Sequence, residues 1–220
     1  MPQPFFDPIM FGLELVFTIA AFIFCVLIFY KTREIYNLTK HKGIRYFRDA
    51  FLFFGLSYVL RFLFSIILVS RIAFDFILPR YFFMPTFILI MGYFSTMAIF
   101  YIIFSSVWKN FDNRILVILG HSVSILLSVI CFLTESHMML FFLQLVLLII
   151  AAMLILAMRK DGKKSFQTKG LYLLTLVLWL INLFITGGRQ PHFFEIGLFF
   201  QIISLIVFAV IYIKVSKWTR

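Results

Sequence analysis

Arg61 needs more explanation than any other side chain in this sequence, because it is always charged and lies deep in an apolar run. The run reads YFRDAFLFFGLSYVLRFLFSIILV and covers residues 46–69. A charge at the centre of a bilayer costs from about 3 to more than 10 kcal/mol, so it requires a partner or water. Glu14 lies in the preceding run. Because consecutive spans run in opposite directions, the two differ in depth by roughly 6 Å, which arginine can cover. We predict a buried Arg61–Glu14 pair, with Tyr58 hydrogen-bonding nearby.

Other polar side chains fall in the same half of their apolar runs as this pair. They are Gln144, Asn182, Gln201 and, closer to the start of its run, Glu195. Two interpretations stay open. Either these groups line a pocket for a small polar or amphiphilic ligand, or they satisfy one another in a network that fixes helix packing. In the first case, the predicted ligand-binding residues are Glu14, Tyr58, Arg61, Gln144, Asn182 and Gln201.

Histidines and carboxylates that could hold a metal lie near the ends of the apolar runs, at Glu135, His137, His192 and Glu195. Such groups are zinc ligands, but here they would have to converge from two separate loops. We therefore predict neither a metal site nor a cofactor.

His121 lies inside the fourth apolar run, close to Ser122 and Ser124. This fits a hydrogen-bonded histidine at a helix contact, and a proton-relay or catalytic role is the alternative. No pair of residues has the proximity and spacing that acid–base or nucleophilic catalysis requires. We therefore predict no catalytic residue, and whether the protein is an enzyme stays open.

The composition places all these residues in a membrane protein. Of the 220 residues, 63% are hydrophobic and 32 are phenylalanine, whereas soluble domains are about 45–50% apolar. The net charge is +11, but the basic residues cluster between apolar runs. That placement is typical of membrane topology and excludes nucleic acid as the expected partner.

Seven runs reach, or nearly reach, the roughly 20 apolar residues that a membrane helix needs. The predicted fold is all-α: a single domain, residues 1–220, formed by a bundle of seven transmembrane helices. Pro85 predicts an irregular or kinked start to the third helix. The predicted spans are 9–30, 50–70, 81–107, 115–133, 138–158, 170–186 and 193–213.

Lysines and arginines predict the orientation of the bundle. Sixteen of the 20 fall in the first, third and fifth loops and the C-terminal segment, and three lie on the opposite side. This places the N-terminus outside and the C-terminus in the cytoplasm of a multi-pass cell-membrane protein. In the first loop, we expect the preceding helix to continue to about Thr39 and the chain to break at Gly43. The basic loops would contact anionic lipid or a cytoplasmic signalling protein.

Small and polar residues recur at spacings of three and four, and in lipid such stripes face other helices. We expect the phenylalanine-rich remainder to face lipid, and the close neighbour of the fourth helix to belong to the same chain. The stripes, besides the polar residues above, are Thr18, Ala21 and Cys25; Ser57 and Ser65; Gly92, Ser95 and Thr96; Gly120, Ser124, Ser128 and Cys131; Ala151 and Ala152; Thr175, Trp179 and Thr186; and Gly197 and Ser204.

The aromatic-rich entry to the second helix, YFRDAFLFFGLSYVLRF, and the seven-helix layout resemble the membrane modules of prokaryotic sensor kinases and their free-standing archaeal relatives. The resemblance implies a sensor or receptor-like module, here without a kinase output domain. It would bind a small molecule or lipid and signal to a separate cytoplasmic partner. A small transporter or channel is the alternative, and an intramembrane enzyme the third reading.

Overall fold

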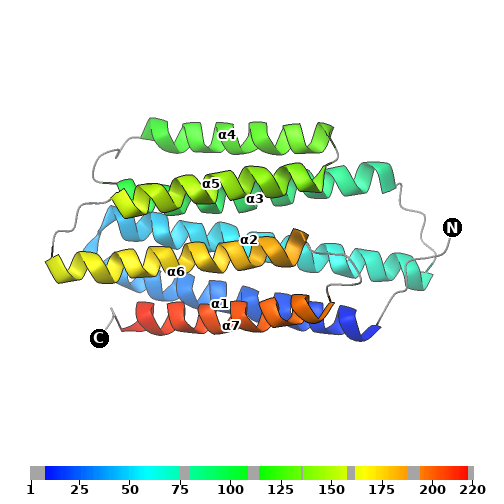
Figure 1. Ribbon diagram of the computed structural model, residues 1–220, viewed down its shortest axis with the longest axis horizontal. Helices are drawn as coiled ribbons and strands as arrows, with labels where there is room; N and C mark the ends of the chain where they lie inside the picture. Colours follow the sequence, from blue (N-terminus) through cyan, green and yellow to red (C-terminus); the bar gives the residue numbers. More distant parts are fainter. Residues whose placement is uncertain are drawn as a thin grey trace.

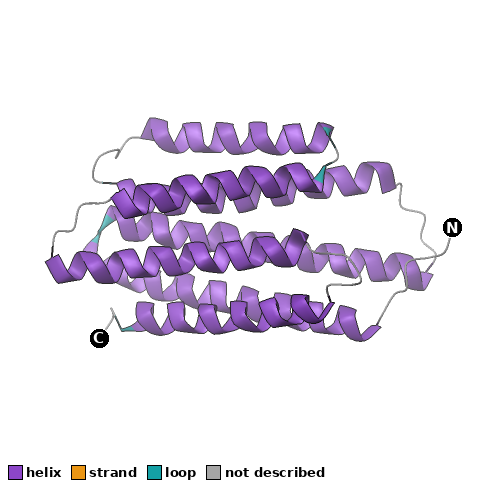
Figure 2. Cartoon of the chain, viewed as in Figure 1, coloured by secondary structure: helices purple, strands orange, loops and turns teal. Residues whose placement is uncertain are grey.

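The computed structural model describes residues 8–74, 80–108, 114–134, 136–157, 162–187 and 194–217. Within these ranges the chain forms seven α-helices and no strand, so the predicted all-α fold is confirmed (Figure 2). The helices are α1 Pro8–Thr39, α2 Lys42–Phe74, α3 Arg80–Val107, α4 Arg114–Leu133, α5 His137–Ala157, α6 Gly162–Gly187 and α7 Phe194–Ser216.

The helices lie alongside one another in alternating directions, in two layers (Figure 1). One layer contains α1, α2, α3 and α4 in chain order, and the other contains α5, α6 and α7. The layers meet where α7 packs on α1 and where α5 packs on α3 and α4. We call the end of the bundle where α1 begins the N-terminal end, and the end where α7 stops the C-terminal end.

Six of the described helices are long and apolar enough to cross a membrane: α1, α2, α3, α4, α5 and α7. The apolar part of α6 is shorter and covers Lys169–Ile185. Much of the outward surface consists of leucine, isoleucine and valine, a surface that lipid solvates and water does not. The chain is therefore a multi-pass helical membrane protein.

The predicted stripes of small and polar residues lie inside the bundle wherever their burial is described, apart from partly exposed positions at their edges. The buried residues of α4 are its four predicted ones, Gly120, Ser124, Ser128 and Cys131. The contact at Gly120 is especially close, because a Cβ built there would lie 2.7 Å from Cζ of Phe104 on α3. The close neighbour of α4 thus belongs to the same chain, as expected.

The expectation that the phenylalanine-rich remainder faces lipid is wrong for many of these residues. Phe51 and Phe208 are among the largest fully buried side chains, and Phe54 is also buried. Phe208 lies near-parallel to Phe24, with ring centroids 5.9 Å apart. Flat rings fill the space between helices and are stabilised by stacking, which explains why many phenylalanines are buried in the interior.

Two expectations about local backbone structure also need correction. The break after α1 falls at Lys40, which adopts a left-handed φ of 51°, and not at Gly43, which lies in the first turn of α2. Gly43 instead allows close packing, since a Cβ there would lie 2.8 Å from Cδ1 of Trp108. Pro85 lies within a continuous α3. Proline perturbs the carbonyl four residues earlier, which here belongs to the first turn.

Replacing Gly120 by leucine should destabilise the protein, because any side chain at this position meets the Phe104 ring. Overpacking of this kind costs typically about 1–3 kcal/mol. Thermal unfolding of the purified protein in detergent measures the effect. Leu119→Phe is the matched control, since Leu119 is exposed. Equal unfolding midpoints for Gly120→Leu and wild type would contradict the close α3–α4 contact.

Candidate functional site

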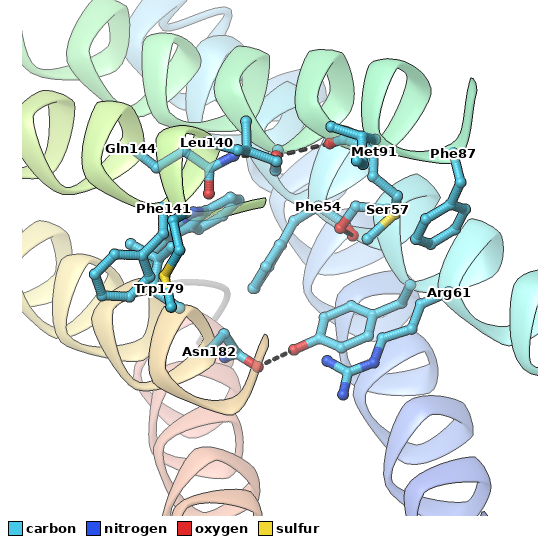
Figure 3. A pocket seen from close by; sticks show the side chains of 15 residues that line it. Phe54, Ser57, Arg61, Phe87, Met91, Leu140, Phe141, Gln144, Trp179 and Asn182 are labelled. Carbon is cyan, nitrogen blue, oxygen red and sulfur yellow. Dashed lines mark hydrogen bonds between the residues drawn. The ribbon is translucent and has the colours of Figure 1, made fainter. Parts of the chain in front are cut away.

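A cavity of about 270 Å³ lies between the two helix layers (Figure 3). Its lining residues place it in the half of the bundle nearer the N-terminal end. Four helices line it: α2 and α3 from one layer, α5 and α6 from the other. Its polar lining residues are Ser57, Tyr58, Arg61, Ser95, Gln144 and Asn182. The remaining walls are apolar and come from Phe54, Phe87, Ile88, Met91, Met138, Leu140, Phe141, Trp179 and Leu183.

Arg61 stands at one side of this cavity and is only 5% exposed. Its Nη2 donates a hydrogen bond of 2.8 Å to Glu14 Oε1, and its Nε donates one of 3.2 Å to the same oxygen. The predicted ion pair is therefore confirmed. Glu14 approaches from α1, behind the cavity wall, and does not itself line the cavity. The pair neutralises the guanidinium while leaving part of it on the cavity surface.

Tyr58 and Asn182 link the two layers across the same cavity. The Tyr58 hydroxyl donates to Asn182 Oδ1 (Figure 3). The amide nitrogen of Asn182 donates to the Leu178 carbonyl at 2.8 Å and to Ser204 Oγ at 3.0 Å. Helices α2, α6 and α7 are thereby joined by one chain of buried hydrogen bonds, which sets their spacing.

Gln144 makes the corresponding link between α5 and α3 on the opposite wall. Its Nε2 donates to Ser95 Oγ, and that hydroxyl in turn donates to the Met91 carbonyl at 2.7 Å. The amide oxygen of Gln144 turns toward the cavity (Figure 3). The cavity wall therefore presents a hydrogen-bond acceptor at Gln144 and a cationic donor at Arg61.

Four of the six residues predicted to bind a ligand line the cavity: Tyr58, Arg61, Gln144 and Asn182. Glu14 acts behind them through Arg61. Gln201 lies on α7 and is not among the lining residues. Around the axis of α7, Gln201 lies about 60° away from Ser204, the residue through which α7 contacts Asn182. Trp179 and Ser95 belonged to predicted stripes, but no sequence signal marked the apolar walls at Phe87, Met91 or Phe141.

Aromatic packing lies between the cavity and the C-terminal end of the bundle. The rings of Phe54 and Trp179 stack with their centroids 3.7 Å apart. About two helical turns further toward the C-terminal end, Phe47 packs on Tyr172 with centroids 5.7 Å apart. Ser105 then bonds to the Tyr172 hydroxyl at 2.8 Å and donates to the Gly43 carbonyl at 2.6 Å. This half of the bundle is held by side-chain contacts between α2, α3 and α6.

His121 is held by two tyrosines of α3, separately from the cavity. The Tyr93 hydroxyl lies 2.9 Å from Nδ1, and the Tyr101 hydroxyl lies 3.3 Å from Nε2. A neutral imidazole offers one donor and one acceptor, so one tyrosine donates and the other accepts. The predicted hydrogen-bonded helix contact is confirmed, and the alternative proton-relay role stays a prediction.

None of the four possible zinc ligands in the two loops has a described side chain. Glu135 and His192 lie outside the described residues, as do the side chains of His137 and Glu195. Within the part of the chain that the structure describes, no group of three histidines, cysteines or carboxylates is placed to hold a metal.

The chain is similar to an uncharacterized protein of Archaeoglobus fulgidus. The two sequences are 26% identical over 217 residues, which cover 94% of this chain and 96% of that protein. No protein-family model and no solved structure matches the chain.

Removing Glu14 alone should destabilise the protein strongly, because it leaves Arg61 buried without its carboxylate. Breaking one side of a buried pair costs about 3–5 kcal/mol, whereas replacing both sides by apolar groups is often neutral. We expect Glu14→Leu to unfold at a markedly lower temperature, and Glu14→Leu with Arg61→Met to recover most of the loss. The matched control is Leu13→Ala, on an exposed neighbour. Additive losses in the double variant would show that the pair is not a stabilising unit.

Proposed function

We propose that this protein is a membrane sensor or receptor-like module that binds a small molecule or lipid in the cavity described above. One observation carries the proposal: polar groups from four helices converge on an otherwise apolar cavity. Ligand sites in proteins have this character, with hydrophobic walls and a few placed polar groups. A network that served only helix packing would need no space at its centre.

In the proposed topology the chain crosses the cell membrane seven times, with its N-terminus outside and its C-terminus in the cytoplasm. The distribution of lysine and arginine supports this orientation. The start of α1 and the end of α7 lie at opposite ends of the bundle, as an odd number of spans requires (Figure 1). In this topology the cavity belongs to the outer half of the membrane.

A signal would pass from the cavity to the cytoplasmic side through a change in the spacing of the two layers. A ligand shifts such an equilibrium by the difference between its affinities for the two states. The layers meet at the cavity through Tyr58 and Asn182. Toward the C-terminal end of the bundle the layers meet through Ser105 and Tyr172. Ser105 also bonds to Gly43, at the corner between α1 and α2 that Lys40 and His41 form. The same helices thus connect the cavity to the basic surface.

The α1–α2 corner is suited to an acidic partner, either a signalling protein or anionic lipid. Some of its charge is neutralised internally, since Lys31 pairs with Glu34 at 2.9 Å and Arg48 with Asp49 at 2.7 Å. Arg45 is more exposed and lies 3.9 Å from Asp49. Exposed cations at a membrane surface attract anionic groups at about 1 kcal/mol each.

The packing toward the C-terminal end favours a sensor over a transporter or channel. Transport needs a polar path on both sides of the cavity, whereas stacked rings of Phe54 and Trp179 separate it from the other end. An intramembrane enzyme has less support, because the described cavity lining offers no paired acid and base.

Reporter fusions test the topology and the seventh span together. We expect alkaline phosphatase, which is active only outside the cytoplasm, to be active when fused after Gly187 and inactive when fused after Ser216. Green fluorescent protein should give the opposite pattern. If α6 does not cross the membrane, the fusion after Gly187 will report the cytoplasm instead, and the proposed topology is wrong.

Filling the cavity tests ligand binding. The protein is purified in nanodiscs from its expression host, and small molecules that co-purify are extracted and quantified by mass spectrometry. We expect Ser57→Phe, which places a ring in the cavity, to lower a specific bound species by at least about tenfold, or ~1.4 kcal/mol. Leu63→Phe is the control, because Leu63 is exposed on the same helix. Identical extracts from wild type and Ser57→Phe would count against the proposal.

A further inference from the structure

We infer that the cavity selects an uncharged amphiphile, with a hydroxyl- or amide-like head and a short apolar body, over an anionic one of the same shape. This inference rests on the proposed ligand-binding function and goes further by naming the chemical class. It depends on three features of the cavity: its charge balance, the hydrogen-bonding groups that are not already used, and its size.

The charge of the cavity is already balanced without an occupant. Arg61 is the one charged side chain among the described lining residues, and Glu14 compensates it through two hydrogen bonds. An anionic head beside Arg61 would place two negative charges against one positive charge in an apolar surrounding. Like charges in such surroundings disfavour each other strongly. An uncharged head avoids this cost.

Among the described lining residues, the Arg61 guanidinium keeps a donor for an occupant and the Gln144 amide keeps an acceptor. Arg61 uses Nε and Nη2 on Glu14, and Nη1 has no hydrogen-bond partner within the described residues. Gln144 uses its amide nitrogen on Ser95 and turns its oxygen toward the cavity (Figure 3). Tyr58 and Asn182 are engaged with each other. A hydroxyl or a primary amide, which both donates and accepts, matches this remaining pair.

The size and walls of the cavity define the rest of the ligand. Its volume of about 270 Å³ accommodates a short chain or a small ring but not an entire phospholipid. Phe87 and Phe141 supply flat walls, and Met91 and Met138 supply flexible ones. Methionine adapts to occupants of different shape. The cavity therefore discriminates between ligands mainly by their polar head groups.

Quenching of Trp179 tests this inference directly. Trp179 lines the cavity and is 2% exposed. It becomes the only tryptophan when Trp108 and Trp218 are replaced by phenylalanine. Two bromine-bearing probes with the same ten-carbon chain are added to this variant in nanodiscs: ω-bromodecanol, which is uncharged, and ω-bromodecanesulfonate, which is always anionic. Bromine quenches tryptophan only at short range, so saturable quenching reports entry into the cavity.

We expect bromodecanol to quench Trp179 saturably and at least about tenfold more tightly than the sulfonate, after correction for partition into the nanodisc. Adding Ser57→Phe should remove the saturable component, and adding Leu63→Phe should leave it unchanged. Equal quenching, or tighter binding of the sulfonate, overturns the selectivity while the ligand-binding proposal stands. If neither probe quenches saturably, the ligand-binding proposal itself fails.

Neutralising Glu14 supplies the decisive comparison. In Glu14→Gln the charge of Arg61 is no longer balanced, so the sulfonate should gain affinity by about tenfold or more while bromodecanol changes little. Thermal unfolding of the same sample establishes that the variant is folded. If it does not fold, the comparison of the two probes in the parent protein still decides the question. A folded Glu14→Gln variant with unchanged probe preference overturns the charge-balance argument.

Discussion

A permanently charged guanidinium cannot be left alone among apolar helices, and the rest of this structure depends on how that constraint is met. Glu14 meets it from the neighbouring helix, through two hydrogen bonds to one carboxylate oxygen. A slide of one helical turn, about 5.4 Å, would break both bonds. Leucine and isoleucine contacts tolerate such a slide far better, since lipid solvates those side chains equally well. The ion pair therefore fixes the register of α1 on α2, and with it the position of the cavity wall.

Two further kinds of contact set the distance between helices once their register is fixed. Small residues bring α4 close to α3, as Gly120 does over the Phe104 ring. Stacked rings hold other helices further apart, as Phe54 and Trp179 do between the layers. The cavity lies beside the stacked rings of Phe54 and Trp179. Where large flat side chains separate two helices, space remains next to them unless another side chain fills it.

These contacts differ in how far the sequence predicts them. The Arg61–Glu14 pair was predictable because an unpaired charge in lipid is so costly that few solutions remain. The face of α4 was predictable because glycine and serine recur at helical spacing. Gln201 does not line the cavity, since membership in a polar stripe does not say which neighbour the stripe faces. The apolar walls and the buried phenylalanines were not predictable, because in lipid an apolar side chain costs little on either side of the helix.

Hydrogen bonds join the two layers at both ends of the bundle, and those at the cavity lie where the proposed occupant would bind. Toward the C-terminal end, Ser105 ties α3 to Tyr172 of α6 and to the Gly43 carbonyl at the α1–α2 corner. The first of these contacts joins the two layers, and the second joins α3 to α2 within one layer. Around the cavity, the layers are bridged by single hydrogen bonds, from Tyr58 to Asn182 and from Gln144 to Ser95. In the proposed sensor, an occupant that bonds to Arg61 or to the amide oxygen of Gln144 would act beside these two bridges. A change in either bridge would alter the spacing of α6 from α2, or of α5 from α3, at the cavity.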